Sequence, residues 1–122
     1  MDIEYRCPIE TTLSYINGKW KILIMKELIT GPVRFGVLKT KLTKVSAKVL
    51  TQQLKEMEAD GIVNRKVFAE VPARVEYSLS EMGTSMLRII KEMAKWGLEN
   101  EKTYPSKCPQ CMNCKLIDDL IS

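Results

Sequence analysis

The apolar residues of this 122-residue chain change their spacing at one point, directly after Gly61. Before that glycine they recur every three or four residues, as in Leu50, Leu54 and Met57, which is the period of an amphipathic helix. After it they alternate along residues 63–69 and 75–79, which is the period of a strand with one buried face. The chain is therefore restricted to a mainly α fold with a small β-hairpin, of the α+β class.

Turn and capping residues divide the helical part. Asn-Gly at 17–18 separates two helices, and Gly-Pro at 31–32 ends the second of them. A short helix is expected over residues 34–42. Ser46 is expected to cap a longer helix, which Gly61 closes.

The end of the chain combines a hairpin, a long helix and a tail. The hairpin tip covers residues 70–73, and Ser80 is expected to begin one helix that runs to about Glu99. That helix carries a wide apolar stripe, formed by Met86, Ile89, Ile90, Met93 and Trp96. Because one small core does not need so wide a stripe, we expect a second copy of the chain to cover part of it. The domain is assigned to residues 1–103 and a cysteine-bearing tail to 104–122.

The net charge of +4 is concentrated in one window of the sequence. Residues 33–55 hold six basic residues and no acidic one, namely Arg34, Lys39, Lys41, Lys44, Lys48 and Lys55. Such a window is typical of a surface that neutralises phosphates. A solvated lysine-rich face is the alternative.

Two helices, a short turn, a third helix and a hairpin follow one another in the order of a winged helix-turn-helix. The third helix would enter the major groove of DNA, where Gln52 can pair with adenine and Lys48 with guanine. The candidate DNA-binding residues are Arg34, Lys44, Ser46, Lys48, Thr51, Gln52, Lys55, Lys66 and Arg74. The alternative is that this polar face only solvates an amphipathic helix.

Residues 7–97 resemble the HxlR-type winged helix-turn-helix transcriptional regulators, relatives of the MarR group. The matching segments include Gly18-Lys19-Trp20-Lys21, Leu50-Thr51-Gln52-Gln53-Leu54 and Val71-Pro72-Ala73-Arg74-Val75. The resemblance implies a homodimer built on extra amino- and carboxyl-terminal dimerisation helices. It also implies that the wing arginine, here Arg74, approaches DNA, and that Cys7 occupies a position used in many members to sense oxidants or electrophiles. It says little about the tail.

The four cysteines leave several readings open. Cys7 is either a redox-sensing thiol, with Cys108 as its candidate partner, or an ordinary packed cysteine. Cys108, Cys111 and Cys114 form a C-x-x-C-x-x-C motif that could bind zinc, exchange disulfides or do neither. Because the chain has no histidine, a fourth zinc ligand would have to be Cys7, a carboxylate such as Asp118, or water.

These features predict a DNA-binding transcriptional regulator rather than an enzyme. No paired carboxylates, phosphate-binding loop or nucleophile motif is present, so no cofactor is expected apart from zinc at the tail. The expected partners are an operator in double-stranded DNA and a second copy of the chain. With neither an export signal nor a membrane span, we expect a cytoplasmic location. The alternatives are a winged helix that binds only proteins and a metal-responsive regulator that uses the tail.

Overall fold

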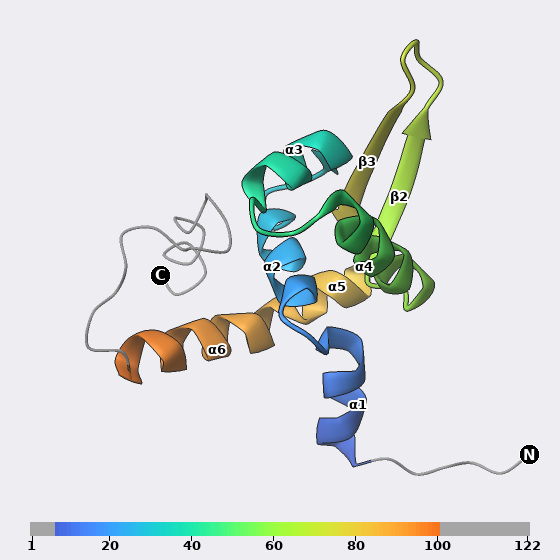
Figure 1. The fold of residues 1–122 in the computed structure, drawn as a ribbon. Coiled ribbons are helices and arrows are strands. Elements are labelled where there is room, and N and C mark those ends of the chain that lie inside the picture. The colour runs from blue at the N-terminus through green and yellow to red at the C-terminus, as the bar shows by residue number, and fades with distance from the viewer. Residues whose placement is uncertain (1–6, 101–122) are drawn as a thin grey trace, which may run out of the picture.

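The computed structural model describes residues 7–100 of the chain, which form helices and a small antiparallel sheet (Figure 1). The elements are α1 (Pro8–Ile16), α2 (Trp20–Glu27), β1 (Val33–Arg34), α3 (Phe35–Lys41), α4 (Ala47–Ala59), β2 (Val63–Phe68), β3 (Arg74–Leu79), α5 (Glu81–Ser85) and α6 (Leu87–Asn100). The predicted α+β winged helix-turn-helix is confirmed. The hairpin and α6 project from opposite sides of the central helices (Figure 1).

The predicted helix boundaries at Gly18, Ser46 and Gly61 hold. The Ser46 hydroxyl accepts a hydrogen bond from the amide of Val49 at 3.1 Å, which satisfies a free donor at the start of α4. Gly18 and Gly61 adopt positive φ values of 76° and 80°, a conformation that glycine tolerates best. The predicted end of α2 is too late, because its last full turn closes at Glu27 and tighter turns follow.

The sheet has three strands, in the order β1-β3-β2, and the sequence predicted only two of them. In the hairpin, Arg65 lies opposite Tyr77 and Lys66 lies opposite Glu76. The additional strand β1 is two residues long and pairs Val33 with Tyr77. Two residues cannot display a period, so β1 left no signal in the sequence.

The predicted single helix after Ser80 is wrong, because the structure contains two helices that meet at Met86. The Ser80 hydroxyl accepts from the amide of Gly83 and donates to the carbonyl oxygen of Ile62, so α5 is fixed against the start of β2. Gly83 packs so closely there that a Cβ atom would collide with the carbonyl oxygen of Ile62. The Met86 amide is shared between the carbonyl oxygens of Met82 and Gly83, and this tightened turn separates α5 from α6.

The hydrophobic core lies beneath α4, between α2, α3 and the sheet. Its fully buried side chains come mainly from the helix-turn-helix, and they are Ile24, Met25, Leu28, Leu38, Leu42, Leu50, Leu54, Met57, Ile62 and Val63. Because α3, α4 and the turn between them all contribute buried side chains, the core fixes the orientation of α4 relative to α3. Within residues 7–100, no helix is long and apolar enough to cross a membrane.

Candidate nucleic-acid interface

Helix α4 presents a polar face on the side opposite its buried stripe. Leu50, Leu54 and Met57 are completely buried. Lys48, Gln52 and Lys55, which follow the same spacing on the other side, are exposed. Thr51 and the capping residue Ser46 are also exposed, next to this face. The prediction that these five polar residues point outward is confirmed, whereas their contact with DNA remains a prediction.

Gln52 belongs to a chain of polar contacts that sequence reasoning missed. Its amide donates to Glu56 at 3.5 Å, Glu56 pairs with Lys21 at 3.1 Å, and Lys21 donates to Asn17 at 3.0 Å. Lys21 is a buried lysine of α2, and Asn17 caps the end of α1. The hydrogen bond from Lys21, and then that from Gln52, lowers the pKa of the Glu56 carboxyl. The candidate base-reading amide is thereby connected to the boundary between α1 and α2.

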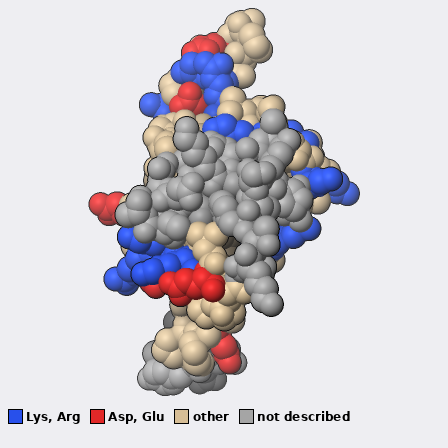
Figure 2. Space-filling view, turned by 90° about the vertical axis from the view of Figure 1, so that its left-hand side faces the viewer, with Lys and Arg blue, Asp and Glu red and all other residues tan. Residues whose placement is uncertain are grey.

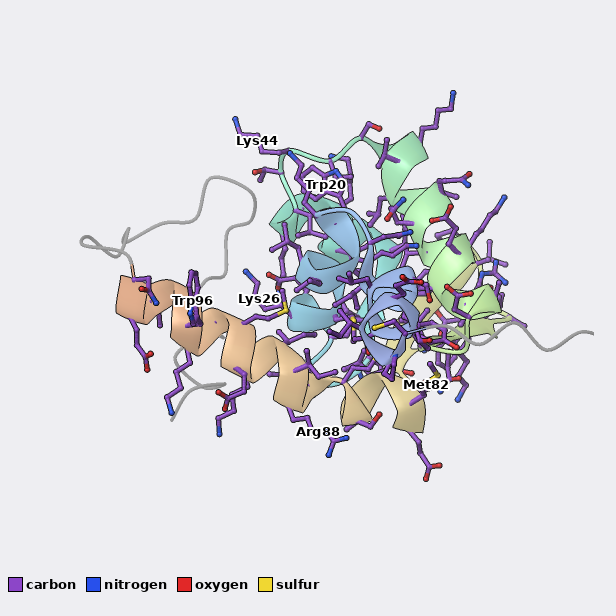
Figure 3. All side chains as sticks on the ribbon, turned by 90° about the horizontal axis from the view of Figure 1, so that it is seen from below. Trp20, Lys26, Lys44, Met82, Arg88 and Trp96 are labelled. Carbon is purple, nitrogen blue, oxygen red and sulfur yellow. The ribbon has the colours of Figure 1, made fainter. Side chains whose placement is uncertain are left out.

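The basic residues of the helix-turn-helix occupy different positions. Arg34 is the exposed N-cap residue of α3, and Lys44 is exposed in the turn between α3 and α4 (Figure 3). Lys41 instead approaches the carboxylate of Glu27, with 4.0 Å between its ammonium nitrogen and a carboxylate oxygen. The charge window therefore divides into cations that face solvent and one that is engaged by an acid.

Glu27 is a completely buried carboxylate at the end of α2. Both Lys26 and Lys41 place an ammonium nitrogen 4.0 Å from it, and neither oxygen accepts a hydrogen bond from the described part of the chain. Burial raises the pKa of Glu27, and the two lysine charges offset part of this rise. No periodic or motif signal singled out this residue in the sequence.

The wing, formed by β2, β3 and the connection between them, has two different faces. Its outer face carries Lys66, Phe68 and Arg74, and the ammonium of Lys66 lies 4.9 Å from the centre of the Phe68 ring. The guanidinium of Arg74 lies 3.8 Å from that ring centre and is 3.3 Å from both Glu70 and Glu76. Figure 2 shows acidic and basic atoms side by side just below the tip of the wing. Arg74 is thus at the wing, as predicted, but two carboxylates engage it.

A cleft of about 860 Å³ separates the wing from α3 and α4. Thr51 lines it from α4, Phe35 and Val37 from α3, and Arg65 and Tyr77 from the sheet. Arg65 is not among the residues predicted from the sequence. Its neighbour Lys66 was predicted instead, although the alternation of apolar residues along 63–69 places Arg65 on the face of Val63 and Val67.

The terminal helices expose apolar side chains. Ile9 and Leu13 of α1 are 69% and 54% exposed, and Met93 and Trp96 of α6 are 48% and 68% exposed. Figure 3 shows Trp96 far along α6, away from the helices of the core. The predicted stripe is therefore divided, since Met86 and Ile90 are buried in the core of this chain. Its outer half alone is available to a partner.

The cysteines are described only at the start of the chain. Cys7 is exposed and is the N-cap residue of α1. Cys108, Cys111 and Cys114 lie outside the described residues, as does Asp118, so the zinc and disulfide predictions remain predictions. Within residues 7–100, no group of three or more His, Cys, Asp or Glu side chains is arranged to hold a metal ion.

The comparison with known proteins identifies the family. The model of the HxlR-like helix-turn-helix family matches residues 15–104, which confirms the predicted resemblance. A Fusobacterium mortiferum protein named as a regulatory protein, MalR, is 47% identical over 98 residues, which are 80% of this chain and 92% of MalR.

Two solved structures are similar in fold and sequence. The redox regulator HypR in its reduced form has a TM-score of 0.76 and 42% identity, with 79% of this chain and 95% of that chain covered. The reduced transcriptional regulator YodB of Bacillus subtilis has a TM-score of 0.70 and 33% identity, with 83% and 100% covered. Oxidised HypR and diamide-treated YodB match as well. The chain belongs to the HxlR-like helix-turn-helix family and is a transcriptional regulator.

Proposed function

We propose that this regulator binds a two-fold symmetric operator in double-stranded DNA as a homodimer and responds to thiol oxidation through Cys7. The observation that carries DNA binding is the polar face of α4, where Lys48, Gln52 and Lys55 are exposed above a fully buried apolar stripe. An α-helix fits the major groove, so a rigidly held helix with these side chains has the form required for base recognition.

The proposed contacts fall into two classes. Gln52 and Lys48 contact base edges, because an amide can pair with adenine and an ammonium with guanine. Arg34, Lys44 and Lys55 contact phosphates near α4, and Lys66 and Arg74 do so from the wing. Thr51 and Ser46 lie close enough to the helix start to add hydroxyl contacts. Arg74→Ala should weaken binding to all duplexes alike and reduce the salt slope by about one unit.

The exposed apolar residues of α1 and α6 support the homodimer. Ile9, Leu13, Met93 and Trp96 would be shielded from water in a two-fold interface between terminal helices. Two α4 helices would then read half-sites about 34 Å apart, one turn of DNA. Light scattering that returned a stable monomer at micromolar concentration would contradict this arrangement, as would a footprint on a single half-site.

Selection from randomised duplex DNA tests the proposal directly. The wild-type protein should enrich a pseudo-palindromic sequence, and its affinity should fall steeply as the salt concentration rises. The matched control is Gln52→Ala, which should retain the salt dependence but lose preference at one base pair. If no duplex is enriched and binding to duplex DNA does not depend on salt, the protein is a winged helix that binds only proteins.

Redox control is supported by the position of Cys7 and by the relatives. Cys7 is exposed at the start of α1, the helix on which Ile9 and Leu13 are exposed in a single chain. HypR is named a redox regulator and matches in reduced and oxidised forms, and YodB matches in reduced and diamide-treated forms. We propose a disulfide from Cys7 to Cys108 of the other subunit, formed when both thiols lose their protons and two electrons to an oxidant such as diamide. The bond would change the angle between the two α4 helices.

Operator binding by wild type and by Cys7→Ser, with and without diamide and after chelation of metal, tests this step. Wild type alone should lose affinity, and non-reducing electrophoresis should show a cross-linked dimer. Zinc held by Cys108, Cys111 and Cys114 would protect these thiols, so a response that appears only after chelation would favour the metal-responsive alternative. Equal loss in both proteins, or no loss in either, would remove Cys7 from the mechanism.

A further inference from the structure

The cleft between the wing and helices α3 and α4 contains a cation that the proposed contacts do not use. Arg65 is on β2 and lies directly opposite Tyr77, which is buried against the helices. Residues that face each other across a strand pair share one face of the sheet, so Arg65 is on the inner face. It lines the cleft together with Thr51 of α4. Lys66, one residue later, is on the outer face opposite Glu76.

The charged side chains that line the cleft differ in whether they are engaged. Arg34, Lys41, Arg65 and Arg74 line it, together with one acid, Glu70. Lys41 approaches Glu27, and Arg74 pairs with Glu70 and Glu76. Among the described residues Arg65 forms no ion pair, and it is exposed. The cleft therefore has an excess of positive charge, with Arg65 on the wall formed by the sheet.

In a DNA complex of this kind, a sugar-phosphate strand would pass beside this cleft. If α4 lies in a major groove and the wing lies over the adjacent minor groove, one sugar-phosphate strand separates the two elements. The cleft is bounded by the wing on one side and by α3 and Thr51 of α4 on the other. Its floor is largely apolar, with Phe35, Val37, Val75 and Tyr77 among the lining residues, which suits the carbon atoms of deoxyribose.

We propose that this cleft holds one sugar-phosphate strand of the operator and that Arg65 binds a phosphate of that strand. The inference rests on the proposed DNA binding and adds a specific site to it. The planar guanidinium of arginine can donate two parallel hydrogen bonds to one phosphate, whereas an ammonium acts as a single point of charge. Thr51 faces the same strand from α4, although its hydroxyl already donates to the carbonyl oxygen of Ala47 at 2.8 Å.

Arg65→Gln is compared with Arg88→Gln, a matched control. Both variants replace one exposed arginine by glutamine, but Arg88 is on α6 and is not among the proposed DNA contacts. Affinity for a duplex selected from randomised DNA is measured from 50 to 200 mM salt. One lost phosphate contact reduces the salt slope by about 0.9, so the affinity of Arg65→Gln should fall about 3.5-fold less than that of wild type across this range. Arg88→Gln should change the slope by less than half as much.

A duplex with a single uncharged methylphosphonate identifies the phosphate itself. Placed in turn at each position between the major-groove and minor-groove contacts, the substitution should weaken wild type at one position and leave Arg65→Gln insensitive there. Arg65→Lys should recover part of the salt slope but only part of the affinity. Thermal unfolding of each variant shows that the fold is retained.

The possible outcomes distinguish a failure of this inference from a failure of the proposed DNA binding on which it rests. If wild type shows no salt-dependent binding to any duplex, DNA binding itself is wrong, and this site is wrong with it. If wild type binds and Arg65→Gln and Arg88→Gln reduce the salt slope equally, the charge acts from a distance and the cleft holds no phosphate. If wild type binds and Arg65→Gln remains sensitive at every methylphosphonate position, Arg65 is not the phosphate ligand.

Discussion

The helix-turn-helix and the terminal helices use apolar residues in opposite ways. In the helix-turn-helix, Leu38, Leu42, Leu50, Leu54 and Met57 are all fully buried within one chain. On the terminal helices, most of the large apolar side chains farthest from the core are about half exposed or more, with Ile9 at 69% and Trp96 at 68%. The DNA-facing unit is thus stabilised by its own core, whereas the outer surface of α1 and α6 is suited to a partner.

This difference in burial predicts different effects for substitutions in the two regions. A change in the core of the helix-turn-helix should alter the stability of the folded chain, because a cavity is left behind. A change on the outer surface of α1 or α6 should leave one chain nearly as stable, because little of that surface is buried by the chain itself. The predictions that follow test this separation, beginning with the largest effect.

Leu54→Ala should lower the free energy of unfolding by about 2 to 5 kcal/mol, since Leu54 is completely buried beneath α4. The matched control is Leu13→Ala, which removes the same atoms from a side chain that is 54% exposed and should cost less than about 1 kcal/mol in the monomer. Urea denaturation at several protein concentrations measures both. Equal losses of unfolding free energy in the two variants at low protein concentration would contradict the distinction between the two regions.

Trp96→Ala should weaken dimerisation about 30-fold, because a buried tryptophan at an interface commonly contributes at least about 2 kcal/mol. Lys95→Ala, at the exposed neighbouring position, should change the dimer much less. Sedimentation equilibrium gives both constants, and the monomer of each variant should unfold as wild type does. An unchanged dimer in Trp96→Ala would place the interface elsewhere.

Gln52→Ala should reduce discrimination at one operator base pair by about 1 to 3 kcal/mol. Glu58→Ala, which also changes an exposed residue of α4, should leave the preference intact. Glu56→Ala should produce part of the Gln52→Ala effect, because Glu56 connects the Gln52 amide to Lys21. Competition binding against single-base variants of the operator provides the measurement. If discrimination in Gln52→Ala equals that of wild type, a different side of α4 faces the bases.

Glu27→Gln should have the smallest effect, and that effect should depend on pH. Because burial raises the pKa of Glu27 above its ordinary 4.5, the folded chain holds this proton at a higher pH than the unfolded chain does. The wild-type free energy of unfolding should therefore fall as pH rises from 4.5 through the raised pKa, relative to that of Glu27→Gln. Urea denaturation over pH 4 to 8 tests the sign, and parallel pH profiles for the two proteins would contradict it.

The part of the fold that the sequence predicted correctly depends on local chemistry. Ser46 and Gly61 set the ends of α4 because a cap and a left-handed glycine act within one turn of helix. The errors arose where distant contacts decide. Strand β1 exists because Val33 pairs with Tyr77, and the break at Met86 directly follows α5, which packs closely on Ile62 through Gly83.

The same distinction between local and long-range interactions applies to the candidate site. The spacing of Leu50, Leu54 and Met57 determined which side of α4 is buried, and hence that Lys48 and Gln52 face outward. Alternation in β2 placed Arg65 on the face of Val63 and Val67 and Lys66 on the other, but it did not show that a cleft lies beside the first face. The cleft depends on how the sheet packs against α3 and α4, a long-range contact with no signature in the strand itself.

By itself, the sequence determined the order of the main helices and the hairpin, the position of the recognition helix and its outward face, because helix periodicity and capping act over a few residues. Only the tertiary structure decided that Arg74 is held by Glu70 and Glu76 and that Lys21 joins α1 to Glu56. It also decided that Glu27 is buried and that Arg65 lines the cleft. The physical reason is that the pairing and burial of a charge depend on which segments meet in space, and local spacing does not specify those meetings.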